Sequence, residues 1–256
     1  MCTLIALHAC HPEVPLAVAA NRDEWLARPS AGFAVRRTAG RVILAPSDLR
    51  AGGTWLGLND AGVFVGLTNR PGSLDESRRS RGLLVLSLLG AGSAAEAAEE
   101  LGRLPDAAYN GFNLFVADRK DAAVAVYEDS VAITECAPGV HVVGNADPND
   151  RAVPKVRRNL EAATRVAAGP PDEWLERLSK ICCAHEGEPP YGATCVHADG
   201  YGTRSSTLLR LGGDGGGELR HAAGAPCETE YKDLSAFLGA LRIDADEPEA
   251  RMAEIR

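Results

Sequence analysis

The order of strands and helices expected along this chain restricts it to few architectures. Apolar alternation and turn residues predict strands over 2–9, 15–21, 41–45, 54–58 and 63–68, then helices over 80–89 and 93–102. A second run of strands (112–117, 122–128, 130–135, 140–143) precedes two helices that begin at 154 and near 172. Three strands over 193–198, 203–211 and 218–223 follow. Runs of strands interleaved with pairs of helices are typical of an α+β layered sandwich and not of alternating βαβ units.

Composition and charge narrow the possible functions. The 256 residues carry a formal net charge of −8, which argues against nucleic-acid partners because non-specific binding needs a basic surface. No apolar run approaches the ~20 residues of a membrane-spanning helix, and no signal-peptide pattern is present, so we expect a cytoplasmic protein without a membrane span. The chain has no segment typical of a linker, and we expect one domain over 1–256 with a loosely held charged tail at 244–256.

The cysteine and histidine pattern predicts no metal site. The seven cysteines are irregularly spaced, no C-x-x-C pair occurs, and we expect reduced thiols. His8, Cys10 and His11 are close in sequence, but on a strand His8 and Cys10 share one face while His11 lies on the other. Three further histidines belong to no motif: His185, His197 and His221.

Cys2 carries the first chemical signal. Its small side chain favours removal of Met1 by an aminopeptidase, which leaves Cys2 with a free α-amine. An α-amine has an ordinary pKa of about 7.7–8.0 and can act as a base near neutral pH. Nucleophile and base then belong to one residue, which is an activated nucleophile without a histidine. Many proteins also carry a cysteine at position 2 without any such role.

A dense polar run, Asn21-Arg22-Asp23-Glu24, ends the second predicted strand. On a strand Asn21 and Asp23 share one side and Arg22 points to the other. A carboxylate at this position can hold the protonated amine of a neighbouring strand's terminus. Taken alone, the run is more typical of a solvated strand end or a turn.

Three later residues are candidates for stabilising negative charge. Asn69 and Asn145 each lie just past a strand end, and two side-chain amides aimed at one point would form an oxyanion hole. Asparagine is also the commonest turn residue, which is the alternative for each. Arg204 lies within a polar-to-apolar strand, where it can stabilise an anion or hold a carboxylate.

Together these segments resemble one family. The chain is similar to the NRDE family, also called Transport and Golgi organisation 2, over residues 1 to about 225 and in the family's order. The motifs that carry the resemblance are Met1-Cys2-Thr3, Asn21–Glu24 with Arg28-Pro29, Gly53–Asn59, Leu67–Asn69, Gly144-Asn145 with Pro154–Val156, and Tyr191-Gly192 with Tyr201–Thr207.

The resemblance implies a fold and a chemistry. The NRDE family is similar in turn to cysteine N-terminal-nucleophile (Ntn) hydrolases that cut linear amides, such as bile salt hydrolase and penicillin V acylase. It implies a four-layer αββα sandwich of Ntn-hydrolase type and hydrolysis or acyl transfer on a small-molecule amide or acyl substrate, without a cofactor. The roles it implies are Cys2 as nucleophile, Asp23 as orienter of the amine, Asn69 and Asn145 as the oxyanion hole, and Arg204 as the late arginine, with Asn21 and Arg22 in support.

One position departs from the hydrolase pattern. Those enzymes place their first arginine three residues before the aspartate, where this chain has Ala20. Arg22 is adjacent to Asp23 and is expected to face elsewhere unless a bulge intervenes.

Two other classes of function remain open. One is a haem-handling or lipid-related binding protein, because eukaryotic relatives of the family are associated with haem movement and membrane trafficking. The other is an Ntn fold kept as a scaffold without chemistry. Four aromatic residues are candidates for an apolar pocket, although core packing is the expected role of most of them: Trp25, Trp55, Phe64 and Tyr191.

Overall fold

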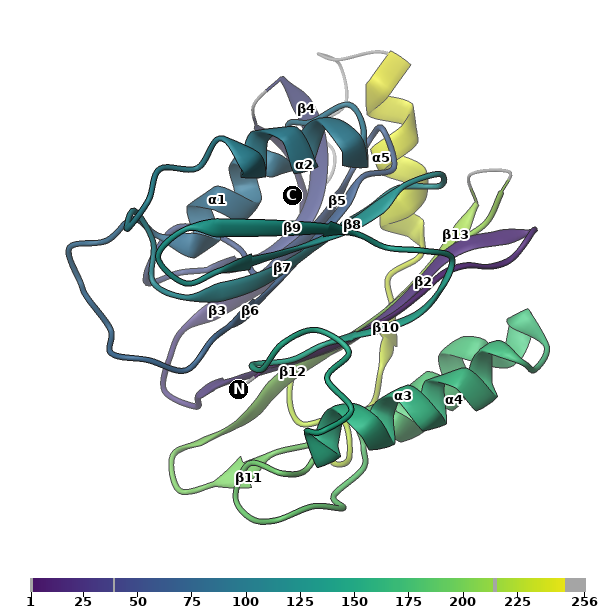
Figure 1. Cartoon of the computed structure of the whole chain (residues 1–256). Coiled ribbons are helices and arrows are strands. Elements are labelled where there is room, and N and C mark those ends of the chain that lie inside the picture. The colour runs from purple at the N-terminus through teal and green to yellow at the C-terminus, as the bar shows by residue number, and fades with distance from the viewer. Residues whose placement is uncertain (1, 39, 214–215, 247–256) are drawn as a thin grey trace.

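The computed structural model describes residues 2–38, 40–213 and 216–246, and it has four layers (Figure 1). Two antiparallel sheets lie face to face, and a pair of helices covers the outer face of each sheet. This arrangement confirms the predicted αββα sandwich. No helix in these ranges is both long and apolar enough to cross a membrane.

The first sheet contains both the N-terminal hairpin and the late strands of the chain. Its strands are β1 (Thr3–His11), β2 (Val14–Trp25), β10 (Gly139–Val143), β11 (His197–Ala198), β12 (Tyr201–Leu211), β13 (Gly217–Ala222) and β14 (Lys232–Asp233). Their order is β10-β1-β2-β12-β13-β14, with β11 beside β12. Strands from both ends of the chain are therefore neighbours at its centre. Helices α3 (Pro154–Ala167) and α4 (Trp174–Cys182), joined by the short 3₁₀ helix η1 (Pro171–Glu173), cover its outer face.

The second sheet consists of consecutive strands. These are β3 (Ser30–Thr38), β4 (Arg41–Asp48), β5 (Leu56–Asn59), β6 (Phe64–Asn69), β7 (Phe112–Ala117), β8 (Ala122–Tyr127) and β9 (Val131–Glu135), in that order. Helices α1 (Arg81–Leu88) and α2 (Ala94–Gly102) cover its outer face. Serine N-caps start both helices: Ser80 accepts the N–H of Leu83, and Ser93 accepts that of Glu96.

Strand β2 shows why the N-terminal segments are apolar on both faces. Leu16 and Val18 point into the core between the sheets, whereas Ala17 and Ala19 pack against α3 and α4. The strand continues through the polar run to Trp25, and Asn21, Arg22 and Asp23 are only 2%, 5% and 3% exposed. The alternative of a solvated strand end is therefore wrong.

Two of the longer elements were not predicted from the sequence, and neither were the two-residue strand β14 and the short helix η1. Strand β3 is an edge strand without a fully buried residue, and helix α5 (Ala236–Asp246) packs Leu238 and Leu241 into the core between the sheets. Within the predicted loose tail, residues 244–246 belong to α5, and residues 247–256 lie outside the described residues.

Candidate active site

Cys2 occupies the space between the two sheets at the end of β1. Strand β1 pairs with β2 on one side and β10 on the other. Continuing both antiparallel registers two residues beyond Leu4 sets Cys2 opposite Arg22 and opposite Asn145. Directly opposed residues share a face of the sheet. Since Leu4 belongs to the core between the sheets, the face that carries Cys2 is turned toward the second sheet.

Arg22 is buried on the same face as the thiol. Its guanidinium lies 4.3 Å from the ring centroid of Trp55, a residue that packs against the core between the sheets. Its Nη2 also lies 3.6 Å from Oε2 of Glu24. Burial raises the pKa of Cys2, and the positive charge of Arg22 is among the influences that oppose this rise. Arg22 is therefore placed to stabilise a thiolate.

Asp23 faces the opposite way, toward the helices, as strand alternation predicts. Its Oδ1 accepts a 2.6 Å hydrogen bond from Thr203 Oγ1 on β12, and Lys155 Nζ from the start of α3 lies 4.0 Å from its Oδ2. Burial raises the pKa of Asp23 to about 6, and the charge of Lys155 opposes the rise. The predicted orienting carboxylate is thus held by a hydroxyl and an ammonium group from two separate elements.

The main-chain carbonyl of Asp23 links the thiol to a group of aromatic rings. It accepts a 3.0 Å hydrogen bond from the hydroxyl of Tyr201 and lies 3.8 Å from Sγ of Cys2. The ring of Tyr201 makes edge-to-face contacts with Trp25 and Tyr191, whose exposed fractions are 60% and 42%. An exposed apolar rim therefore lies beside the site.

The two candidate oxyanion residues are in direct contact. Asn145 donates a hydrogen bond from Nδ2 to the main-chain carbonyl of Asn69, although Asn69 ends β6 of the second sheet and Asn145 lies in the loop after β10 of the first. The loop that carries Asn145 is anchored to the second sheet: the carbonyl of Gly144 accepts from Thr68 Oγ1 at 2.5 Å and from Asn113 Nδ2 at 3.0 Å. The two asparagines therefore meet where the sheets approach each other, and their role as an oxyanion hole beside Cys2 stays a prediction.

Arg204 lies at a bulge. Thr203 pairs with Asp23 and Ser205 pairs with Arg22, so Arg204 is an extra residue on β12. Its Nε is buried and has no hydrogen-bond partner within the described ranges. The residue is therefore at the same end of the sheet as Cys2, but the bonds described do not link it to the thiol.

Asn21 has a structural connection rather than a direct contact with the thiol. Its Nδ2 donates 2.9 Å hydrogen bonds to the carbonyls of Cys182, at the end of α4, and Thr194. It thereby fastens the centre of the first sheet to the helical layer behind it.

Two charged residues of the site were not predicted as such. Lys155 was part of a motif that carried the family resemblance, but no pattern in the sequence assigns it to Asp23. Arg81, the first residue of α1, donates from Nη1 to the carbonyl of Gly111 at 2.9 Å. Burial lowers the pKa of Arg81, and ionised Cys2 opposes this effect, so a second guanidinium lies within electrostatic reach of the thiol.

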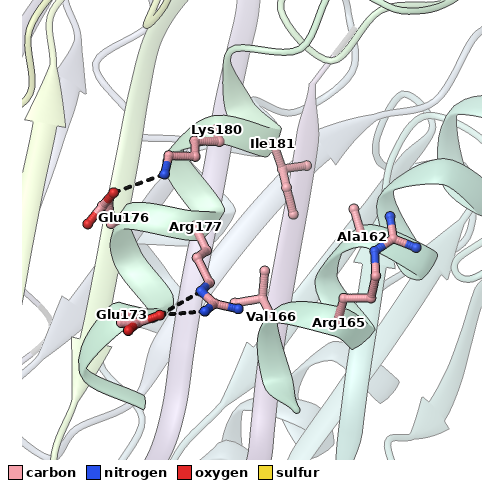
Figure 2. Close-up of a pocket in the computed structure, with 8 residues that line it drawn as sticks. All are labelled: Ala162, Arg165, Val166, Glu173, Glu176, Arg177, Lys180 and Ile181. Carbon is pink, nitrogen blue, oxygen red and sulfur yellow. Dashed lines mark hydrogen bonds and ion pairs between the residues drawn. The ribbon is translucent and has the colours of Figure 1, made fainter. Parts of the chain in front are cut away.

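A surface hollow of about 580 Å³ between α3 and α4 contains none of these residues (Figure 2). Its charged side chains pair along the helix, Arg177 with Glu173 at 2.5 Å and Lys180 with Glu176 at 2.9 Å. Pairs of this i,i+4 type are ordinary features of a solvated helix surface.

Comparison with known sequences identifies relatives over most of the chain. The family described as Transport and Golgi organisation 2 matches residues 1–219. The human Transport and Golgi organization protein 2 homolog is 31% identical over 234 residues, which is 78% of this chain and 83% of the human protein. The Bos taurus homolog is 29% identical over 233 residues, with the same two shares covered.

Solved structures with the same fold are cysteine hydrolases of the Ntn type. A Caenorhabditis elegans N-acylethanolamine-hydrolyzing acid amidase ortholog matches with a TM-score of 0.58 and 12% identity, covering 80% of this chain and 91% of its own. The C2A mutant of conjugated bile acid hydrolase from Clostridium perfringens matches with a TM-score of 0.58 and 12% identity, covering 92% of this chain and 93% of its own. Penicillin V acylase from Agrobacterium tumefaciens matches with a TM-score of 0.58 and 13% identity, covering 91% of this chain and 86% of its own. At these identities the likeness shows the fold alone.

Proposed function

We propose that this chain, which belongs to the Transport and Golgi organisation 2 family, is an amide hydrolase or acyl transferase that forms a thioester on Cys2. The observation that supports the proposal is the position of Cys2 just before β1, with its Sγ 3.8 Å from the carbonyl of buried Asp23, on an Ntn-hydrolase fold. The names of its structural neighbours, an amidase, a conjugated bile acid hydrolase and an acylase, favour acyl chemistry on small molecules.

Activation of the thiol requires a base, because burial raises the pKa of Cys2. Under the proposal Met1 is removed and the free α-amine of Cys2 takes the thiol proton, directly or through one water. The positive charge of Arg22 stabilises the resulting thiolate. The Asp23 carboxylate, fixed by Thr203, orients the ammonium group that forms.

Attack on the substrate carbonyl places negative charge on its oxygen. Asn145 has a second N–H on the nitrogen that binds the Asn69 carbonyl, and the side-chain amide of Asn69 is the other donor that we assign to the oxyanion. A carbon–sulfur bond forms and the carbon–nitrogen bond breaks. The leaving amine takes a proton from the Cys2 ammonium group, and a thioester remains.

The thioester is then consumed by an acceptor. When water attacks, the acyl group leaves as a carboxylic acid and the thiol of Cys2 is restored; when an amine attacks, the acyl group is transferred. The exposed rings of Trp25 and Tyr191 offer an apolar surface beside the site. They favour a substrate whose acyl group is apolar.

Active-site labelling tests the proposal. Protein with an intact mass that starts at Cys2 is treated with acyl electrophiles and with a panel of N-acyl amino acids, and adducts are located by peptide mass spectrometry. We expect an acyl adduct on Cys2 and turnover that Cys2→Ala abolishes. Cys10→Ala is the matched control, since Cys10 is a partly buried thiol on β1, the strand that follows Cys2. Native turnover in Cys2→Ala, or an inert panel without an adduct, would contradict the proposal.

A further inference from the structure

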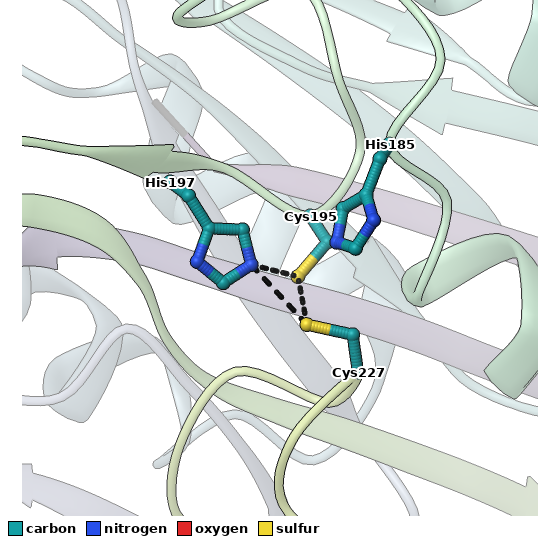
Figure 3. A group of neighbouring side chains, drawn as sticks. All are labelled: His185, Cys195, His197 and Cys227. Carbon is teal, nitrogen blue, oxygen red and sulfur yellow. Dashed lines mark hydrogen bonds between the residues drawn. The ribbon is translucent and has the colours of Figure 1, made fainter.

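Four side chains with metal-binding atoms meet on the side of the first sheet that faces α3 and α4. They are His185, Cys195, His197 and Cys227, and their ligand atoms all lie within 4.8 Å of one another. Figure 3 shows the two imidazole rings and the two sulfurs turned toward one point. His197 comes from β11, His185 and Cys195 from the segment before it, and Cys227 from the loop after β13.

The distances that join the ligand atoms of Cys195, His197 and Cys227 are close to those in the shell of one small cation, and His185 completes the group within 4.8 Å. Cys195 Sγ lies 3.5 Å from Cys227 Sγ and 3.6 Å from His197 Nε2, and His197 Nε2 lies 3.2 Å from Cys227 Sγ. The rings of His185 and His197 have centroids 5.2 Å apart. With Zn–S near 2.3 Å and Zn–N near 2.0–2.1 Å, a tetrahedral ion holds its ligand atoms roughly 3.3–3.8 Å apart.

We propose that His185, Cys195, His197 and Cys227 form a structural Zn²⁺ site. Two thiolates and two neutral imidazoles are the Cys₂His₂ donor set that zinc takes in closed sites, and no ligand position remains for a substrate. Soft sulfur and nitrogen ligands select zinc over calcium or magnesium, which prefer oxygen. Both histidines are exposed while Cys195 is buried, so an ion has a route to the site from solvent.

A disulfide explains the group less well. Both thiols are free in the structure, with their sulfur atoms 3.5 Å apart, whereas a bond requires about 2.05 Å. A disulfide would also leave the convergence of His185 and His197 on the same sulfurs without a reason. One cation accounts for all four side chains.

The site has a consequence for the Asp23 side of the active site. Cys195 lies between Thr194, whose carbonyl accepts from Asn21, and Val196, whose N–H donates to Thr203 Oγ1 at 2.8 Å. That same Thr203 hydroxyl donates to Asp23. Zinc would therefore fix the segment that holds both Asn21 and Thr203, and would tie it to the loop carrying Cys227. This role does not depend on the proposed catalysis.

The experiment measures metal in the full chain. Protein is purified under reducing conditions from cells grown with added zinc, dialysed, and analysed by inductively coupled plasma mass spectrometry. We expect one zinc per chain. Replacing zinc by Co²⁺ is expected to produce the visible bands of tetrahedral cobalt and thiolate-to-cobalt charge-transfer bands in the near ultraviolet.

Variants separate this site from adventitious binding. Cys227→Ser and His185→Asn are expected to reduce bound zinc to near zero after dialysis against a weak chelator. Cys183→Ser is the matched control and should keep one equivalent, because its thiol contacts the Cys227 loop, at the Pro226 carbonyl 3.2 Å away, without joining the group. The cobalt spectrum of the unaltered chain decides the question even where a variant fails to fold.

Three outcomes would overturn the site. The first is reduced protein that holds no zinc and gives no tetrahedral cobalt spectrum. The second is a Cys195–Cys227 disulfide, found by alkylation and mass spectrometry, as the state of the protein in its native cells. The third is a full zinc equivalent that persists when Cys227→Ser and His185→Asn are combined.

Discussion

Lys155 Nζ lies 4.0 Å from Asp23 Oδ2, where the side chain of Asp23 is fully buried and that of Lys155 is 14% exposed. The pair joins the start of α3 to the centre of the first sheet. Burial raises the pKa of Asp23 to about 6, and Lys155 keeps it from rising further. Two predictions follow from this relationship, one for the carboxyl itself and one for stability.

Replacing Lys155 by methionine should raise the pKa of Asp23 above about 6, because the opposing positive charge is lost. Titration of ¹³C-labelled aspartate by NMR reports this shift without any substrate. If Asp23 acts as its ionised form, the acid limb of the pH–rate profile moves to higher pH in the same direction. Lys120→Met, at an exposed lysine, is the control and should leave the titration of Asp23 in place.

The pH dependence of stability has a definite sign. The pKa of Asp23 is higher in the folded chain, about 6, than its ordinary value of 3.8, so ionising it opposes folding. The stabilising contribution of protonated Asp23 to the free energy of unfolding is fully present below pH 3.8 and is lost as the pH rises through about 6. The shift corresponds to about 3 kcal/mol.

Denaturation of the parent chain and Asp23→Asn at several pH values checks this sign. Asp23→Asn loses a constant amount of unfolding free energy because its contact with Lys155 is broken. As the pH rises from 4 to 7 the parent chain should lose stability relative to the variant, so the difference between the two should change in favour of the variant. A difference that is flat across this window would contradict the raised pKa.

Arg22 should contribute to the reactivity of the thiol, alongside the α-amine and the Asp23 main chain. Its charge opposes the rise in the pKa of Cys2, so Arg22→Gln should raise that pKa further and slow alkylation of Cys2 at neutral pH. A rise of one unit lowers the thiolate population about tenfold. The pH dependence of iodoacetamide labelling, followed at the Cys2 peptide, measures this. Arg22→Lys keeps the positive charge, so its labelling rate at Cys2 should lie between those of the parent chain and Arg22→Gln. Equal labelling rates in all three proteins would show that Arg22 does not activate the thiol.

Gly53 is expected to be intolerant of any side chain. A Cβ at this position would collide with the backbone of Gly82, at the start of α1, where Thr54 N–H also donates to the Gly82 carbonyl at 3.1 Å. Gly53→Ala should therefore cost about 1–3 kcal/mol of unfolding free energy. Gly32→Ala is the matched control, because a Cβ at Gly32 meets nothing within 4 Å. Equal denaturation midpoints for the two variants would contradict the close approach.

The fold was predictable where strands alternate clearly or are apolar throughout. Strands β7 and β8 and helices α1 and α2 lie within a residue or two of their predicted bounds, because two buried faces or a serine cap define them. Strand β3 was missed because an exposed edge strand needs no apolar alternation. Helix α5 was missed because its amphipathic pattern is short and becomes charged after Leu241.

The site was predictable only in part. Alternation along β2 already sets Arg22 and Asp23 on opposite faces, and the structure adds that the Arg22 face is the one with Cys2. The contacts of Lys155 and Arg81 depend on how helices dock on the sheets, which no local pattern encodes. The group around Cys195 was missed because its spacings match no zinc motif, and the haem and scaffold alternatives stay untested predictions.

Asn145 provides the sharpest test of the proposed chemistry. Its Nδ2 is already held by the carbonyl of Asn69, so the donor is oriented before substrate arrives. A donor of this kind acts mainly on the oxyanion of the transition state, and its loss typically costs 10²–10³ in turnover. We therefore expect Asn145→Ala to lower kcat by about 10²–10³ with little change in KM, measured on whichever substrate labels Cys2.

Asn110→Ala is the control, since Asn110 binds Asp75 in a peripheral loop and should leave kcat unchanged. The loop of Asn145 keeps its anchors at Thr68 and Asn113, so the thermal midpoint of Asn145→Ala should fall only slightly. If KM rises while kcat is maintained, Asn145 binds the ground state of the substrate, and the oxyanion role belongs to another donor.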